Sequence, residues 1–457
     1  MMKSMRMAAF WGVTALVIFQ LSGGVSGAQD SSPVNPGKGL PKAAGVSKTP
    51  DEGIIKKGET LSLAQCIDIA QKRQPNIIAA MNTVDAARSR VGQAQANYFP
   101  QVSVSGGYSR ISPVGGLSGS AGGGSFDQYT SSAQLTQNIY DFGKTSTQVS
   151  IQRFNVDATR SDLENVTEQI VFNVKQAYYS LLQAKKNRDV AAETVGQFEQ
   201  HLEQAKGFYE VGTKPRFDVT KAEVDLSNAK LNLIRAGNAV KIAAVNLNNA
   251  IGVPDAPDYT IVDDLAFRKY GMTFDAALAK AFSNRPDIQA LAARRKVSEQ
   301  TVELAKKNYY PTVTGDAAYN WGGSKFPLNE GWNVGATVSM PVFSGFLTKH
   351  QVGEAKSNLD VVRANEELLR QNVLLDVQQS YLNLQEAENR VPTSELAVRQ
   401  ATENLEIANG RYAAGVGSPI EVTDAQVAYS NAKTAYIQAL SDYKVAQSSL
   451  ERAMGGK

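Results

Sequence analysis

Two long stretches of the chain carry apolar residues at coiled-coil spacing. In residues 144–210, apolar residues form two rows, and within each row they recur at a spacing of seven positions, which is the pattern of a coiled-coil seam. This predicts a helix over 144–210, about 100 Å long. A matching row from Val377 to Tyr412 predicts a second long helix, in which Pro392 is expected to cause a kink or a break. The first pair of rows comprises Val156, Leu163, Ile170, Ala177, Ala184, Ala191 and Phe198, with Val174, Leu181, Val195, Leu202 and Tyr209.

Shorter helical patterns flank each long one. Residues 62–97 and 273–308 each predict one helix of about 36 residues that stops at a proline. After each long helix, a glycine-containing turn precedes a returning helix of about 33 residues, which ends near Ala250 or Ala453. Because the two shorter helices together match the long one in length, we expect them to stack end to end beside it.

The segments after the motifs NYFP (97–100) and NYYP (308–311) alternate apolar and polar residues. This alternation predicts two strand hairpins, at 100–140 and 311–343. Strict period two over about 10 residues is typical of strands in a membrane barrel, with lipid on one face and water on the other. A soluble, half-buried hairpin gives the same pattern. The apolar face is expected to include Val102, Val104, Tyr108, Ala133, Leu135, Ile139, Val313, Ala317, Tyr319, Trp321, Trp332, Val334 and Val338.

The chain contains the same module twice. The opening helices align at an offset of 211 residues, and from Ile139-Tyr140, which pairs with Val342-Phe343, the copies align at an offset of 203. The difference falls at the run GGLSGSAGGGS (115–125), so the first copy carries a longer loop. We therefore expect a first repeat at 59–252, a linker at 253–271 and a second repeat at 272–457.

The N-terminus resembles an export signal. Lys3 and Arg6 precede an apolar core, and the small residues Ser26-Gly27-Ala28 follow it, which predicts a signal peptide over 1–28. An uncleaved amphipathic anchor is the alternative. Residues 29–58 are rich in Pro, Gly, Ser and Lys and are expected to form a flexible arm.

Composition gives no sign of an enzyme or of a nucleic-acid partner. The formal charge is +3, and +1 once Lys3 and Arg6 are set aside. His201 and His350 lie in helical runs without a cluster of ligands, so they are expected to have packing or surface roles. The single cysteine, Cys66, is expected to be a small buried residue. No catalytic residues, metal site or cofactor are predicted.

Four strands cannot close a membrane barrel, since known single-chain barrels start at about eight. Open strand edges cannot be exposed to lipid, so several chains would have to share one barrel. Tyr98, Phe99, Tyr309 and Tyr310 stand where strand meets helix and fit the membrane–water boundary, where aromatic side chains are enriched. Two other interpretations remain open: a periplasmic coiled-coil scaffold without a pore, and a secreted adhesin or filament protein.

The ordered set of motifs resembles the outer-membrane efflux protein family, the TolC-like exit ducts of Gram-negative bacteria. The matching residues are the two Asn-Tyr-(Phe/Tyr)-Pro junctions, Ile139 to Gly143, Pro341 to Gly345, and the tip motif in which Arg411-Tyr412-x-x-Gly415 precedes Glu421-Val422. Each motif is weak singly, but the repeated set is specific.

The resemblance implies a mainly α fold with membrane β structure. Family members are homotrimers in which an α-helical coiled-coil barrel joins a shared 12-stranded transmembrane β-barrel, with four strands per chain from the two tandem repeats. It also implies the outer membrane, with a long periplasmic extension, and a passive exit duct of a tripartite efflux pump or type I secretion system. The implied partners are outer-membrane lipid, a periplasmic adaptor protein and an RND-type or ABC-type inner-membrane transporter.

The resemblance further implies a gate at the helical tips. In the second copy, the gate residues are Glu421, Asp424 and Tyr412. In the first copy, Asp218 matches Glu421, but Lys221 stands where Asp424 stands in the second copy. The alternative is that these acids only stabilise helix N-termini. Some relatives have an arginine that locks the tip at the position of Gly417. Here Lys214 and Arg216 of the first copy are the candidates for the role of that arginine. The expected adaptor contacts, which could instead simply terminate helices, are Val211, Gly212, Thr213, Ala414, Gly415, Val416 and Ser418.

Overall fold

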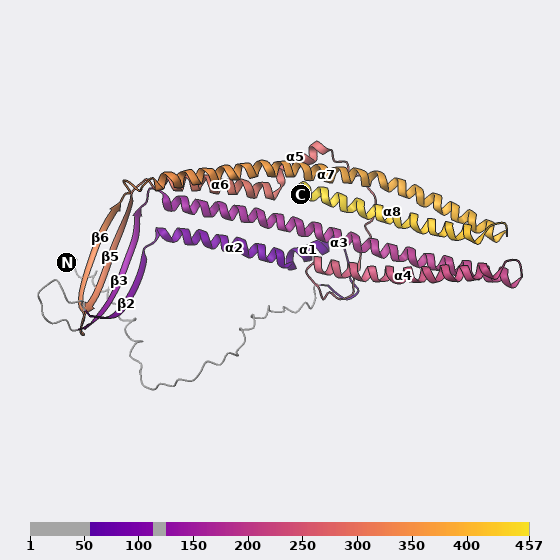
Figure 1. The fold of residues 1–457 in the computed structure, drawn as a ribbon, viewed down its shortest axis with the longest axis horizontal. Coiled ribbons are helices and arrows are strands. Elements are labelled where there is room, and N and C mark those ends of the chain that lie inside the picture. The colour runs from indigo at the N-terminus through magenta and orange to yellow at the C-terminus, as the bar shows by residue number, and fades with distance from the viewer. Residues whose placement is uncertain (1–54, 113–124, 457) are drawn as a thin grey trace, which may run out of the picture. The chain divides into compact units, whose positions relative to one another are not determined.

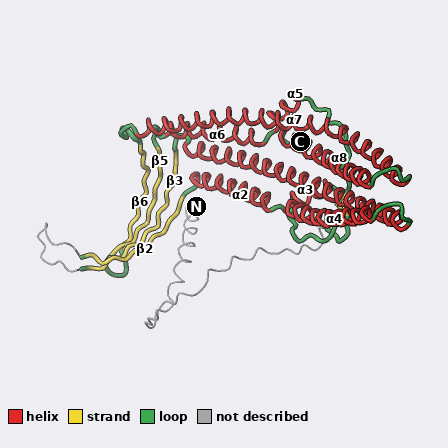
Figure 2. The backbone as a smooth tube through the Cα atoms, turned by 45° about the vertical axis from the view of Figure 1, so that its right-hand side comes forward, coloured by secondary structure: helices red, strands yellow, loops and turns green. Residues whose placement is uncertain are grey.

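The computed structural model describes residues 55–112 and 125–456, which belong to one unit of the chain. The predicted signal peptide and the arm up to residue 54 lie outside the described residues. A four-stranded sheet stands at one end of a set of long helices, and two helical tips stand at the other (Figures 1 and 2). Within the described residues, no helix has the length and apolar character needed to cross a membrane.

The two long helices are α3 (Lys144–Glu210) and α7 (Leu347–Ala413), each 67 residues long. The prediction for 144–210 is confirmed. The expected break at Pro392 does not occur, because α7 continues through it. The neighbouring Ala387 and Val391 are only 1% exposed in an apolar cluster, and the Ser394 hydroxyl donates to the Arg390 carbonyl oxygen. Packing of the turn that precedes the proline thus outweighs the loss of one helical hydrogen bond.

Each opening helix is two helices, so the prediction of one helix at 62–97 and one at 273–308 is wrong. The first repeat has α1 (Leu63–Arg73), α2 (Pro75–Gln95) and a 3-10 turn, η1 (Ala96–Tyr98). The second has α5 (Phe274–Asn284) and α6 (Pro286–Lys307). Gln74 and Arg285 adopt ψ of 119° and 124° because the ring of the following proline disfavours helical backbone there. Pro75 and Pro286 then begin the next helix, a position that suits proline.

The returning helices are α4 (Arg216–Ala250) and α8 (Pro419–Ala453), and each ends at one of these breaks. The Gln74 amide donates to the Ala250 carbonyl oxygen at 3.0 Å, and the Arg285 guanidinium donates to the Ala453 carbonyl oxygen at 3.1 Å. These bonds satisfy carbonyl groups that a helix C-terminus leaves without partners. The predicted end-to-end stacking beside the long helix is confirmed (Figure 1).

Residues 55–58 and the predicted linker pack on the helices. Strand β1 (Thr60–Leu61) pairs in parallel with β4 (Thr260–Ile261), and the Gly58 N–H donates to the Asp258 carbonyl oxygen at 2.8 Å. Ile55 is 6% exposed within the apolar cluster that also buries Cys66. The expectation of a flexible arm is therefore wrong for residues 55–58, while the buried role of Cys66 is confirmed.

The two predicted hairpins join into one antiparallel sheet of order β2-β3-β5-β6. The strands are β2 (Gln101–Ile111), β3 (Phe126–Tyr140), β5 (Thr312–Gly323) and β6 (Asn329–Ser339). Strands β2 and β6 lie at the two edges, and neither pairs with a further strand among the described residues.

The strand register gives the sheet two chemically different faces. One cross-strand row reads Val104, Ala133, Tyr319 and Trp332, and the adjacent row on the other face reads Ser105, Ser132, Asn320 and Gly331. The predicted alternation is confirmed. The apolar face is bare within one chain, since Val104, Trp332 and Val334 are 73%, 74% and 72% exposed.

Candidate functional site at the helical tips

Two tight turns end the molecule at the side away from the sheet (Figure 1). In the first, Gly212 has φ +74° and the Thr213 N–H donates to the Phe208 carbonyl oxygen at 2.9 Å. In the second, Gly415 has φ +76° and the Gly417 N–H donates to the Arg411 carbonyl oxygen at 2.9 Å. Glycine fits both left-handed positions without steric cost, and each turn satisfies carbonyl groups at the end of its long helix.

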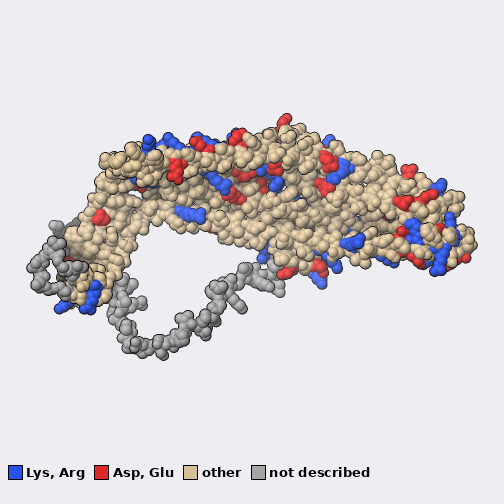
Figure 3. Space-filling view, in the orientation of Figure 1, with Lys and Arg blue, Asp and Glu red and all other residues tan. Residues whose placement is uncertain are grey.

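Both turns carry exposed apolar side chains. Val211 and Val416 are 72% and 70% exposed, and Phe217 follows the first turn at 63%. Ser418 instead serves as the N-cap of α8, its hydroxyl accepting from the Ile420 N–H at 3.2 Å. The remaining predicted adaptor residues, Gly212, Thr213, Ala414 and Gly415, are exposed in the turns. On the face drawn in Figure 3, acidic and basic side chains gather at this end of the molecule.

Tyr412 lies fully buried between the two tips. Its ring centroid is 5.0 Å from that of His201 and 5.5 Å from that of Phe208, both on α3. Burial, and after it the charge of Asp218, raises the Tyr412 pKa. The Tyr412 hydroxyl has no hydrogen-bond partner among the described residues, and Asp218 itself is 5% exposed. The structure thus brings together two of the predicted gate residues from different repeats.

Lys214 reaches across from the first tip to the second. Its Nζ donates to the Gly417 carbonyl oxygen at 3.4 Å and lies 5.6 Å from the centroid of the Tyr412 ring. A Cβ at Gly417 would lie 2.8 Å from the Tyr412 backbone nitrogen, so this turn has no room for a side chain there. Of the two basic residues considered as substitutes for the missing arginine, Lys214 makes this contact, and Arg216 is exposed at the start of α4.

The predicted acids lie in three different environments. Asp218 is buried, Glu421 forms a half-exposed ion pair with Arg411 at 3.2 Å, and Asp424 is exposed. The structure therefore does not present them as one uniform ring within a chain. Both Asp218 and Glu421 lie in the first turn of their helices, as expected also under the alternative that these acids only stabilise helix N-termini.

Contacts between the repeats add residues that sequence reasoning missed. Asp225 pairs with Lys221 at 2.9 Å and accepts from the Thr423 hydroxyl at 3.0 Å, which links α4 to α8. His201 is 3% exposed against Tyr412, which confirms its packing role, and burial lowers its pKa. Because these contacts join helices of different repeats, no periodicity within one helix signals them; the offset of 203 residues identifies only the matching turns.

The fold and the tips define a class of proteins in which paired helical hairpins carry strand hairpins at the opposite end. A sequence profile described as outer membrane efflux protein matches residues 66–253 and 277–456, that is, both repeats. The chain therefore belongs to the outer membrane efflux protein family, and it is an outer-membrane channel protein.

Individual relatives agree with this membership. The chain is 24% identical over 443 residues to the outer membrane protein TolC of Escherichia coli, covering 91% of this chain and 86% of that protein. Among solved structures, CusC superposes with a TM-score of 0.74 at 18% identity, over 86% of this chain and 92% of CusC. The CmeC outer membrane channel of Campylobacter jejuni gives a TM-score of 0.74 at 17% identity, over 86% and 85%. These two structural similarities support the fold alone.

Proposed function

We propose that three copies of this chain share one 12-stranded membrane barrel and one helical tunnel, forming the passive exit duct of an efflux or secretion system. The observation that carries this proposal is the sheet. Its apolar face is bare and its edge strands, β2 and β6, are unpaired among the described residues. Three such sheets joined edge to edge would satisfy the edge hydrogen bonds and turn the apolar faces to lipid.

The long helices support the same assembly. An apolar stripe on α7 is exposed, with Val361, Leu368, Leu375 and Leu382 between 53% and 58%. The counterparts of Val361 and Leu382 on α3, 203 positions earlier, are Ala158 and Tyr179, which are 4% and 5% exposed, whereas Asn165, the counterpart of Leu368, is exposed. Helix α3 packs on α6 and α8. In the two repeats, α7 corresponds to α3, α2 to α6 and α4 to α8. Because α3 packs on α6 and α8, the α7 stripe should pack on α2 and α4 of a second copy. A complementary stripe is exposed on α4: Val224, Leu231, Ile234, Ile242 and Val245.

Aromatic side chains would mark the boundary of the membrane. Tyr98, Phe99, Tyr309 and Tyr310 are between 49% and 65% exposed where the sheet meets the helices. The Tyr310 ring stacks on Phe142 with ring centroids 5.6 Å apart, which ties the second junction to the turn between β3 and α3. Rings with one apolar and one polar end suit this interface.

The lipid-facing claim can be tested with brominated lipids, which quench nearby tryptophan. After removal of the signal, the chain holds Trp321 and Trp332, and both lie on the apolar face of the sheet. We expect reconstitution into brominated phosphatidylcholine to remove more than half of the fluorescence. Unchanged fluorescence would favour the periplasmic scaffold without a pore, and a Trp332→Phe variant identifies which ring is quenched.

The tips would serve two roles at the periplasmic end of the duct. The exposed turns carrying Val211, Val416 and their neighbours would receive a periplasmic adaptor protein, which connects to an RND-type or ABC-type inner-membrane transporter. Tyr412, Asp218, Glu421 and Asp424 would line or close the gate, with Lys214 in the position of the absent arginine. The energy for export would come from the inner-membrane partner.

The role of Lys214 gives a prediction with a matched control. Lys214→Gln removes the contact with the Gly417 carbonyl and the Tyr412 ring, so we expect a conductance at least twofold above wild type in planar bilayers. Arg216→Gln removes the same charge two residues away and should leave conductance near wild type. Equal effects of both variants would mean that only the total charge of the tip matters.

A further inference from the structure

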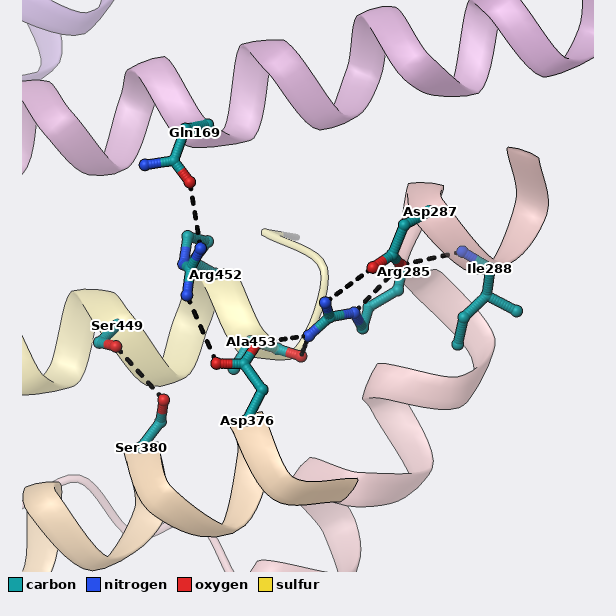
Figure 4. Close-up of polar contacts among 9 residues, drawn as sticks. All are labelled: Gln169, Arg285, Asp287, Ile288, Asp376, Ser380, Ser449, Arg452 and Ala453. Carbon is teal, nitrogen blue, oxygen red and sulfur yellow. Dashed lines mark hydrogen bonds and ion pairs between the residues drawn. The ribbon is translucent and has the colours of Figure 1, made fainter. Parts of the chain in front are cut away.

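Helix α3 meets α8 of the same chain through pairs of polar side chains, which we call the intrachain contact. Near the centre of the molecule, the Arg452 guanidinium donates to the Gln169 side chain at 3.0 Å and pairs with Asp376 of α7 at 3.4 Å (Figure 4). Further along, the side-chain amide of Gln183 donates to the side-chain oxygen of Gln438. The other side-chain pairs are Lys175 with Glu451, Thr194 with Ser430, and Glu193 with Tyr429 and Lys433.

The relation between the repeats locates the matching contact between two copies of the chain. Because α7 corresponds to α3 and α4 corresponds to α8, each residue of the intrachain contact has a counterpart 203 positions away, on α7 of one copy or on α4 of the next. Gln183 corresponds to Glu386 on α7, and Gln438 corresponds to Arg235 on α4. A neutral amide pair inside the chain therefore corresponds to two opposite charges in the proposed contact between copies.

The two kinds of contact carry their ion pairs at different positions. Among the corresponding side-chain pairs of the described residues, only Arg235 with Glu386 combines opposite charges. The intrachain ion pairs do not recur between copies, since the counterparts of Lys175 and Glu451 are both amides and the counterpart of Glu193 is a leucine. The full set of corresponding pairs is Asn372 with Asn249, Gln378 with Asn248, Glu386 with Arg235, Ala397 with Ser227, and Leu396 with Leu226 and Lys230.

Arg235 stands beside the apolar stripe of α4. It is exposed, and none of the described residues of its own chain forms an ion pair with it. Leu231, Ile234 and Ile242 of the stripe, on the same helix, are 45%, 70% and 55% exposed. Packing α7 of a second copy on this stripe would remove part of the guanidinium from water. Because burying a charge without a partner is costly, this surface needs an acidic group from the second copy.

Glu386 belongs to a group of side chains with one acid in excess. Its carboxylate is 62% exposed and pairs with Arg390 at 3.4 Å, and Arg390 also pairs with Asp442 of α8 at 2.8 Å. Two carboxylates thus share one guanidinium. The Gln438 amide, which donates to Asp442 at 2.7 Å, adds no charge. A guanidinium from a second copy would make this group neutral.

We propose that Arg235 of one copy binds Glu386 of the next, and that this ion pair selects α7 of a second copy as the partner of α4. This assignment rests on the proposed trimer, because it joins two copies of the chain. The apolar stripes supply buried area, whereas the ion pair supplies specificity. A shift of one heptad along the contact would place Glu386 opposite Asn228 or Ile242 and leave both charges without a partner.

The same charges disfavour the wrong pairs of helices. If α4 of a second copy packed on α3, Arg235 would meet the neutral Gln183, and if α8 of a second copy packed on α7, Glu386 would meet the neutral Gln438. The charges therefore favour a ring in which first and second repeats alternate. Glu386 precedes Tyr412 by 26 residues on α7, which is about 39 Å, so this ion pair is separate from the tips.

Charge reversal tests the ion pair through the mass of the detergent-extracted protein. Arg235→Glu and Glu386→Arg each place like charges at the contact, so we expect at least a fivefold loss of the three-chain species with unchanged helical circular dichroism. Both substitutions in one chain restore opposite charges, and the yield should return to within twofold of wild type. Arg363→Glu is the control and should keep the wild-type yield, because Arg363 is 58% exposed and lies about 160° around α7 from Val361 of the apolar stripe.

A mixture of the two single variants gives a further check. When Arg235→Glu and Glu386→Arg chains are co-expressed, unlike neighbours in a ring meet with opposite charges. A ring of three must still hold one contact between two copies of the same variant. The trimer yield should therefore lie between the yields of the single variants and that of the double variant. A yield no higher than that of the single variants would overturn the proposed pair.

Failure of the ion pair and failure of the trimer give different results. A trimeric wild type beside a double variant that stays dissociated, or beside single variants with wild-type yield, would overturn the ion pair and leave the trimer standing. A wild-type protein with the mass of one chain would overturn both, because there would be no second copy for Arg235 to bind.

Discussion

Replacing Val104 with lysine should remove most of the protein from the outer membrane. Val104 is 73% exposed on the apolar face of β2, where the proposed barrel meets lipid. A lysine at the midplane of a membrane barrel costs about 2–4 kcal/mol, and the trimer would carry it three times. We expect at least a tenfold loss of protein from urea-washed outer membranes, measured by quantitative immunoblot.

The control for this variant is the neighbouring residue. Ser103 is on the opposite face of the same strand, where it pairs with Gln134 across to β3. Ser103→Lys places the same charge toward water in the proposed barrel, so it should assemble within a factor of two of wild type. Equal losses for the two variants would contradict the assignment of the faces.

Replacing Leu382 with aspartate should dissociate the proposed trimer without unfolding the chain. Leu382 is 54% exposed on α7 and is the last residue of the stripe that should pack on a second copy. Burying an unpaired carboxylate three times in the assembly costs about 3 kcal/mol or more per copy. In detergent, we expect the mass of one chain with unchanged helical circular dichroism.

Asn383 supplies the matched control, since it is exposed and lies about 100° further around the same helix. Asn383→Asp adds the same charge beside the stripe and not on it, and this variant should remain trimeric. A trimeric Leu382→Asp variant would show that the α7 stripe is not covered by a second copy.

Periodicity predicted the helices well where packing continues along one surface. The helix predicted over 144–210 has the same bounds as α3, because α4, α1 and α2 pack along the length of α3. The same criterion failed at Pro75 and Pro286. One helical pattern was predicted across each of these prolines, but a local steric rule decides the backbone of Gln74 and Arg285. At Pro392 packing outweighs the local effect of proline, since the buried Val391 and Ala387 hold α7 together.

The site was predictable only where a motif marks it. The tip motif placed Tyr412 and Asp218 at matching turns, and the structure brings them together between the repeats. The link from Lys221 through Asp225 to Thr423 depends on how α4 lies beside α8, which the sequence of either helix does not reveal.

The central claim is that three chains share one duct, and the mass of the purified assembly tests it most directly. The protein should be extracted from envelopes with detergent and measured by light scattering, with the detergent contribution subtracted. We predict three copies of the mature chain, recovered only from a membrane fraction that requires detergent. A monomer released from envelopes by salt alone would contradict the shared barrel and leave the periplasmic scaffold as the better description.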